Sequence, residues 1–257
     1  MPATALQHFS EDILRTRAIL AHARMLPIAT AAEQTLRSDL LRSAWMFAVG
    51  ALDAYFCDAY TDVVAASVSS KSRQNSMTLP AFVSSIKFPI RAILEEYDNP
   101  NWRWRMAARE LMEKESVLSL GAIQDLFNKF FRDKHRLFGD VLHEWITHPD
   151  AKPRLFGFAP SSYLLMTPKD RDAARKAARR HFESHFRELF QRRHDCIHNC
   201  DRPRTRPQPM KAAAQVAKVI QDVEFLVRRC DGHIATEFRQ FLLDAGYSPA
   251  TLSAVNY

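Results

Sequence analysis

The chain has 257 residues, of which 47% are hydrophobic and 25% charged, a composition typical of a folded globular protein. Only 6 residues are glycine, and neither GxGxxG nor GxxxxGK[ST] occurs, which excludes nucleotide sites built on those glycine loops. The formal charge of +7 is compatible with a nucleic acid as partner.

The sequence predicts a reduced, cytoplasmic protein without a membrane partner. The N-terminus has no basic region followed by an apolar stretch, and the apolar run at 44–52 is far shorter than the ~20 residues that span a bilayer. The cysteines are too few for a disulfide scaffold and form no CxxC pair: Cys57, Cys196, Cys200 and Cys230.

Hydrophobic residues recur at helical spacing, and no segment alternates as a strand would. The first predicted helix covers residues 10–25, with Ser10 as its N-cap. The second covers 32–68, and its apolar middle predicts the central core helix. Residues 69–76 are polar and predict a loop.

The middle of the chain predicts helices with interruptions. Thr78 is the expected cap of the first, and Pro89 should kink or split it. Residues 147–168 contain Pro149, Pro153 and Pro160 ahead of Pro168, and they predict an irregular connection. The predicted helices are 78–97, 102–117 and 119–146, the last with a break at 130–140.

Two long helices are expected to complete an all-α chain. Thr167 as N-cap and Pro168 at the first position begin a helix that should extend to Asn199. The last helix should cover 210–243. The expected organisation is an N-terminal helix in 1–30, a helical domain at 31–245 and a tail at 246–257.

The positive charge is concentrated in residues 169–206. This segment has ten arginines and two lysines against six acidic residues, so it carries +6 of the total +7. Arginine pairs with phosphate through a planar fork, and histidine exchanges protons near neutral pH. A solvated helix face is the alternative for such a charge run. The segment also holds four histidines, His181, His185, His194 and His198, of which the first two are expected to be structural.

The end of this segment reads Arg193-His194-xxx-His198. The pattern resembles the RxxxxH motif of HEPN-domain ribonucleases, which stands at the end of a long helix before the last helix of a bundle. An aliphatic run followed by Asp53 resembles the early core helix of that family. Residues 119–127 are similar to a segment of its RiboL-PSP branch.

The resemblance implies an all-α, HEPN-like helical bundle with additional N-terminal and middle helices. It implies a metal-independent endoribonuclease without a cofactor, which acts on RNA as a homodimer. It also implies a role as a toxin or antiviral-defence effector, with an antitoxin or defence-system protein as a further partner.

The chemistry of RNA cleavage assigns roles to the motif, because RNA carries its own nucleophile, the 2′-OH. We expect His198 to transfer a proton, Arg193 to hold the phosphate charge, and His194 to orient the site or contact RNA. The expected supporting residues are Asp53, Asp195 and Asn199, and the expected RNA contacts are Arg192, Arg202, Arg204 and Arg206.

Helix geometry leaves alternatives open for the motif. Arg193 and His198 are five residues apart, about 140° around a regular helix. They act together if the helix loosens before Asn199, if Arg193 reaches across, or if two copies form a composite site. Asp53 holds Arg193 or His198, or it is the buried partner of another arginine.

Two other functions remain open. One is a zinc site made of two pairs of potential ligands, although these point to different faces. The other is a non-catalytic HEPN-like module that binds RNA or nucleotides or docks a protein. The potential zinc ligands are His194, His198, Cys196 and Cys200.

Overall fold

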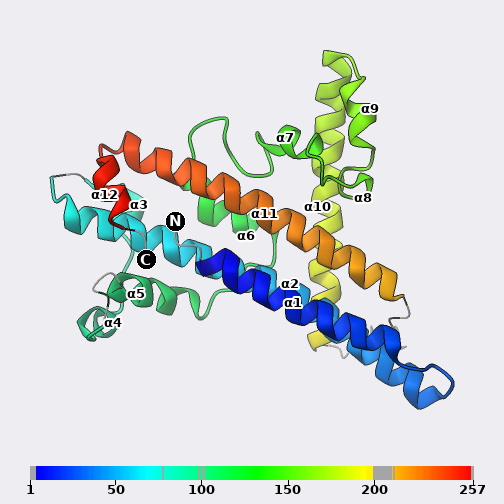
Figure 1. The fold of residues 1–257 in the computed structure, drawn as a ribbon. Helices are drawn as coiled ribbons and strands as arrows, with labels where there is room; N and C mark the ends of the chain where they lie inside the picture. Colours follow the sequence, from blue (N-terminus) through cyan, green and yellow to red (C-terminus); the bar gives the residue numbers. More distant parts are fainter. Residues whose placement is uncertain are drawn as a thin grey trace.

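The computed structural model of the chain describes residues 4–76, 78–97, 99, 102–198, 210 and 212–255. Within them the regular elements are helices and no strand occurs, so the chain is all-α, as predicted (Figure 1). The long helices are α1 (Thr4–Met25), α2 (Ala31–Arg73), α10 (Pro168–His198) and α11 (Ala213–Asp244). The short ones are α3 (Ala81–Ser84), α4 (Ile90–Leu94), α5 (Trp102–Met112), α6 (Leu120–Phe127), η1 (Asn128–Phe130), α7 (Leu142–Ile146), α8 (Pro153–Phe156), α9 (Pro160–Leu164) and α12 (Pro249–Ser253).

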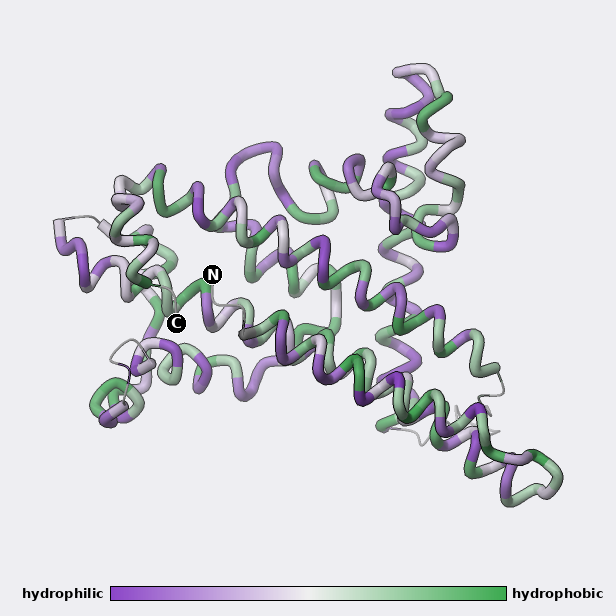
Figure 2. The backbone as a smooth tube through the Cα atoms, in the orientation of Figure 1, coloured by the Kyte–Doolittle hydropathy of each residue, from purple (hydrophilic) through white to green (hydrophobic). Residues whose placement is uncertain are grey.

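Three long helices lie side by side, and the fourth crosses them. Helices α1, α2 and α11 contact one another along their lengths, and α10 stands across α2 and reaches beyond it (Figure 1). Phe9 of α1, Phe56 of α2 and Leu226 of α11 are buried in the shared core. Figure 2 shows hydrophilic residues along much of α10, which agrees with the basic segment found in the sequence. The helix that carries the motif is therefore only partly enclosed.

The central helix α2 is longer than predicted. It begins after Thr30 and continues to Arg73, so the loop predicted at 69–76 is wrong for its first five residues. Ser69 and Ser70 are fully buried, and Gln74 bonds to the C-terminal segment through Gly246. Tertiary packing therefore keeps this polar segment helical, and the local pattern of polar residues does not predict that effect.

The start of α2 is a capping box. The hydroxyl of Thr30 accepts from the Glu33 amide at 3.2 Å, and the Glu33 carboxylate accepts from the Thr30 amide at 2.8 Å. Two amides that the helix leaves without partners are thus bonded.

Replacing Thr30 with alanine should lower the free energy of unfolding by about 0.5–2 kcal/mol, because one of these bonds is lost and the N-cap is weakened. Urea denaturation followed by circular dichroism measures the change. Thr35→Ala is the matched control, since Thr35 is exposed and, among the described residues, its hydroxyl donates to the Ala31 carbonyl within α2. Equal stability losses in the two variants would show that the capping box contributes nothing of its own.

The first helix begins six residues before its predicted N-cap. Ser10 lies inside α1, where its hydroxyl donates to the Leu6 carbonyl at 2.7 Å. Ala5 and Phe9 are buried against the core, so the preceding turn is held in place by packing. Ser10 as N-cap is therefore a wrong prediction.

The single helix predicted at 78–97 is also wrong. The segment forms only α3 and α4, which begin after Pro80 and Pro89, so the split at Pro89 is confirmed. Helix α5 ends at Met112, five residues before the predicted end. Within 119–146 the predicted break is confirmed, with non-glycine residues of positive φ at Lys134 and Phe138. The proline-rich connection contains α8 and α9, each of which begins at a proline.

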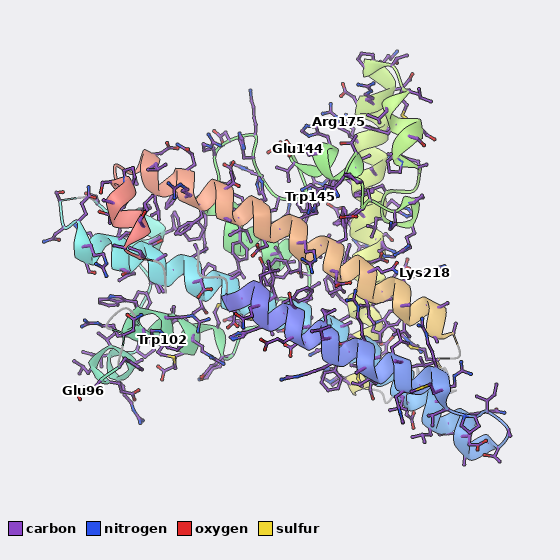
Figure 3. The ribbon with its side chains drawn as sticks, viewed as in Figure 1. Glu96, Trp102, Glu144, Trp145, Arg175 and Lys218 are labelled. Atoms are coloured by element: carbon purple, nitrogen blue, oxygen red, sulfur yellow. The ribbon has the colours of Figure 1, made fainter. Side chains whose placement is uncertain are left out.

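An aromatic cluster fixes α10 on the rest of the fold. Phe182 is fully buried; its ring stacks on Phe156 of α8 at 5.5 Å and meets Trp145 of α7 at 6.2 Å. Figure 3 shows Trp145 between α7 and α10. Phe186 continues the cluster one turn later, 4.8 Å from Phe182. Each such buried side chain contributes about 1.5–3 kcal/mol, so the middle of α10 is firmly held.

A buried ion pair joins α2 to α5. Nε of Arg105 lies 2.8 Å from Oδ1 of Asp62, and the exposed fractions of the two residues are 2% for Arg105 and 0% for Asp62. Oδ2 of Asp62 and Nη2 of Arg105 are buried without a hydrogen-bond partner among the described residues. Trp102, labelled on α5 in Figure 3, lies over the Arg105 guanidinium at 5.6 Å. Burial raises the pKa of Asp62 to about 6, against the lowering effect of Arg105.

Stability should therefore depend on pH through Asp62. Its carboxyl holds its proton more tightly in the folded chain than in the unfolded one, where the pKa is about 3.9. This contribution is greatest below about pH 4 and is lost as the pH rises towards about 6. Asp62→Asn removes the titration. The free energy of unfolding of this variant should therefore rise relative to that of the wild type as the pH increases from about 4 to about 6. Urea denaturation at a series of pH values tests this, and a difference that does not change with pH would contradict it.

Candidate active site at the C-terminal end of α10

The motif helix is capped as predicted. The Thr167 hydroxyl accepts from the Asp170 amide at 3.3 Å, and Pro168 begins the helix. The helix then continues to His198, so no loosening occurs between Arg193 and His198. These two residues therefore stay about 140° apart around the axis.

Two histidines of the motif form a pair on one face of α10. The ring centroids of His194 and His198 are 4.3 Å apart, with 39° between the ring planes. Both residues are exposed, and among the described residues neither ring has a hydrogen-bond partner. The ring nitrogens of both histidines are therefore available to bind a ligand or to take part in proton transfer.

The other two histidines of α10 are tied into the fold, in agreement with their expected structural role. Nε2 of His185 lies 2.9 Å from Oδ2 of Asp222, and Nε2 of His181 lies 3.0 Å from the Arg154 carbonyl oxygen. Of the four histidines on this helix, only the pair at its end is free of such bonds within the described residues.

Arg193 lies apart from the histidine pair. Its side chain is half-buried, and Nε is buried without a hydrogen-bond partner among the described residues. A buried donor without a partner is costly, so the position favours an incoming acceptor. Within one chain, however, Arg193 and His198 do not share a face of the helix.

The expected supporting residues have other partners. Oδ1 of Asp53 accepts from the Val117 amide at 2.6 Å, and Oδ2 lies 3.4 Å from the Ser116 hydroxyl. Asp53 thus holds the segment between α5 and α6, and among the described residues it bonds to neither Arg193 nor His198, so that prediction is wrong. Among the described residues no arginine bonds to Asp53 either, and a backbone amide is its partner there.

Asp195 and the predicted RNA contacts are only partly placed. The Asp195 carboxylate accepts from Gln191 at 2.9 Å, one turn earlier on α10. Arg192 lines a pocket between α10 and α11. The remaining predicted site residues lie outside the described residues: Asn199, Arg202, Arg204 and Arg206.

A cleft leads to the histidine pair. It lies between α6 and α10, has a volume of about 500 Å³ and includes His194 at one end. Arg187 and Phe190 contribute from α10, and Leu120 and Gly121 contribute from the first turn of α6. The sequence drew no attention to this cleft, because its two walls are some 70 residues apart in the chain.

A buried charge cluster is the other feature that the sequence analysis missed. Asp222 is 1% exposed, and its carboxylate bonds to the Arg154 guanidinium at 2.7–3.1 Å as well as to His185. A signal was present, because Asp222 lies within the apolar stripe of the last helix beside Val219 and Val223. The cluster joins α8, α10 and α11 and thereby positions the motif helix.

The potential metal ligands do not come together within the described residues. There, no three His, Cys, Asp or Glu side chains are grouped closely enough to hold a metal ion. Cys196 is buried, and Cys200 lies outside the described part of the chain. In the same part of the chain, no helix combines the length and apolar character needed to cross a bilayer.

Comparisons with protein-family models, with curated proteins and with solved structures found no match to this chain.

Proposed function

We propose that the chain is a HEPN-like, metal-independent endoribonuclease that works in the cytoplasm as a toxin or antiviral-defence effector. The observation that carries the proposal is the exposed pair of His194 and His198 at the end of the basic helix, without hydrogen-bond partners among the described residues. The other histidines of this helix are used by the fold, so this pair is the group available for proton transfer.

The proposed reaction needs only side chains and the RNA. A base takes the proton of a 2′-OH, whose oxygen then attacks the adjacent phosphorus. The bond from phosphorus to the 5′-oxygen breaks, and an acid supplies the proton that the leaving oxygen needs. The products are a 2′,3′-cyclic phosphate and a 5′-OH. His198 transfers the proton from the 2′-OH to the leaving 5′-oxygen, His194 orients the site, and Arg193 stabilises the negative charge that develops on the phosphate oxygens.

A homodimer reconciles this chemistry with the helix geometry. Arg193 and His198 lie on different faces of one α10, so one copy does not present both to the same phosphate. Two α10 ends that meet across a two-fold axis can combine Arg193 of one protomer with His198 of the other. An antitoxin or defence-system protein that covers this end of the helix would then control activity.

The same separation of Arg193 and His198 favours the second candidate function, a non-catalytic RNA-binding module. One experiment distinguishes the two. Purified protein is incubated with RNA in excess EDTA, and the ends of the products are identified. Cleavage that leaves 2′,3′-cyclic phosphate ends supports the ribonuclease. Binding of intact RNA without cleavage supports the module, and the absence of both would overturn both functions.

A further inference from the structure

The cleft between α6 and α10 combines a cation, a histidine and an apolar floor. Arg187 and His194 line it from α10, while Leu118 and Phe190 provide apolar surface. Its volume of about 500 Å³ lies in the range of sites that enclose a small ligand. A nucleotide has matching parts, because its base is flat and apolar on its faces and its phosphate is anionic.

The charge balance of the cleft favours an anion. Among the described residues, the exposed Arg187 has no hydrogen-bond or ion-pair partner. The one acidic residue in the cleft, Glu183, is bound to Nε of Arg179 at 2.8 Å. The guanidinium of Arg187 is therefore the charge that remains to attract a ligand.

The opposite wall adds backbone donors to these side chains. Ser119 caps α6 and engages the amides of Ala122 and Ile123, so the first-turn amides that it does not engage are those of Leu120 and Gly121. Leu120 is buried, whereas Gly121 is exposed and lines the cleft. A Cβ atom at Gly121 would meet only the Ser119 hydroxyl, at 3.8 Å. The backbone is thus open to close approach from the cleft.

We propose that this cleft holds an RNA nucleotide with its phosphate between Arg187 and the first turn of α6, next to the phosphodiester at His194 and His198. The inference rests on the proposed function, since the histidine pair sets the direction in which the RNA continues. Arg187 is then a positioning residue that places RNA for cleavage without taking part in proton transfer.

Binding is measured separately from cleavage, by fluorescence anisotropy of a short labelled single-stranded RNA on the His198→Ala background. Arg187→Ala should weaken binding about tenfold or more, since it removes a charge-assisted hydrogen bond. It should also reduce the slope of log affinity against log salt by about one. Arg180→Ala is the matched control, because Arg180 is also exposed on α10 but lies outside the cleft. Its affinity should equal that of the parent.

Gly121 offers a second, independent test. Gly121→Asp places a negative charge at the first turn of α6, where acidic residues stabilise helices, so the fold should tolerate it. Gly121→Asn has nearly the same size without the charge. The Asp variant should bind RNA about tenfold more weakly than the Asn variant, and thermal denaturation checks that both are folded.

The outcomes separate this inference from the proposed function. Unchanged RNA affinity in both Arg187→Ala and Gly121→Asp would overturn the cleft as a binding site, even if the wild type cleaves RNA. Weakened binding in these two variants, with no cleavage by the wild type, would support the cleft and overturn the ribonuclease. If the His198→Ala protein itself does not bind RNA, the proposal that the cleft binds RNA is overturned.

Discussion

His198→Ala should cleave RNA about 10²–10⁴-fold more slowly than the wild type, because it removes the group proposed to transfer a proton. The His198 ring is exposed and has no hydrogen-bond partner among the described residues, so stability should change by less than about 0.5 kcal/mol. The measurement is the initial rate of formation of 2′,3′-cyclic phosphate ends in EDTA. His22→Ala, at an exposed histidine in the last turn of α1, is the matched control and should cleave at the wild-type rate.

If the His198→Ala variant cleaves RNA at the wild-type rate, another residue transfers the proton, and the main support for the proposed function is removed. Arg193→Ala should be as defective as His198→Ala if the guanidinium stabilises the negative charge on the phosphate oxygens. Arg193→Lys keeps the charge but loses the planar fork, so it should restore only part of the rate.

Mixing the two inactive proteins tests whether the site is shared between protomers. In a heterodimer, the Arg193→Ala protomer supplies His198 and the His198→Ala protomer supplies Arg193, so one of two composite sites is complete. Random exchange makes half of the dimers heterodimers, and about a quarter of the wild-type activity should return. If activity does not return although exchange is demonstrated, Arg193 and His198 do not act across a dimer interface.

The sequence predicts the long helices well because their signals are local. Apolar residues at helical spacing identified α2 and α11, and Thr167 with Pro168 marked the start of α10. The angular separation of Arg193 and His198 also follows from helix period alone, and it persists because α10 stays regular. The sequence was weakest at 78–97, where two prolines leave segments too short for periodicity to decide.

Partners across the fold could not be predicted, because they depend on which helices meet. The sequence shows that Asp53 follows an aliphatic run, but its bond to the Val117 amide depends on the path that the chain takes after α5. Asp62 and Asp222 stand out as acids among apolar neighbours, which predicts burial, yet their arginine partners come from other helices. The cleft beside His194 exists only because α6 packs against α10.

Arg105→Met should lower the free energy of unfolding at neutral pH by about 3–5 kcal/mol, because it leaves the Asp62 carboxylate buried without its cation. Asp58 does not compensate, since it is an acid and lies 4.0 Å from the same guanidinium. Urea denaturation gives the value. The control is Arg109→Met on the same helix, where the arginine is exposed, with an expected change within about 0.5 kcal/mol.

The cause of that loss can be separated from lost packing in two ways. Asp62→Leu combined with Arg105→Met replaces the ion pair by apolar side chains and should recover most of the stability, because no buried charge remains. The loss in Arg105→Met alone should also shrink as the pH falls through about 6, where the Asp62 carboxyl takes up its proton even beside Arg105 and no buried carboxylate remains. A loss that stays constant with pH and persists in the double variant would mean that the Arg105 side chain stabilises the contact between α2 and α5 by packing, with its charge contributing little.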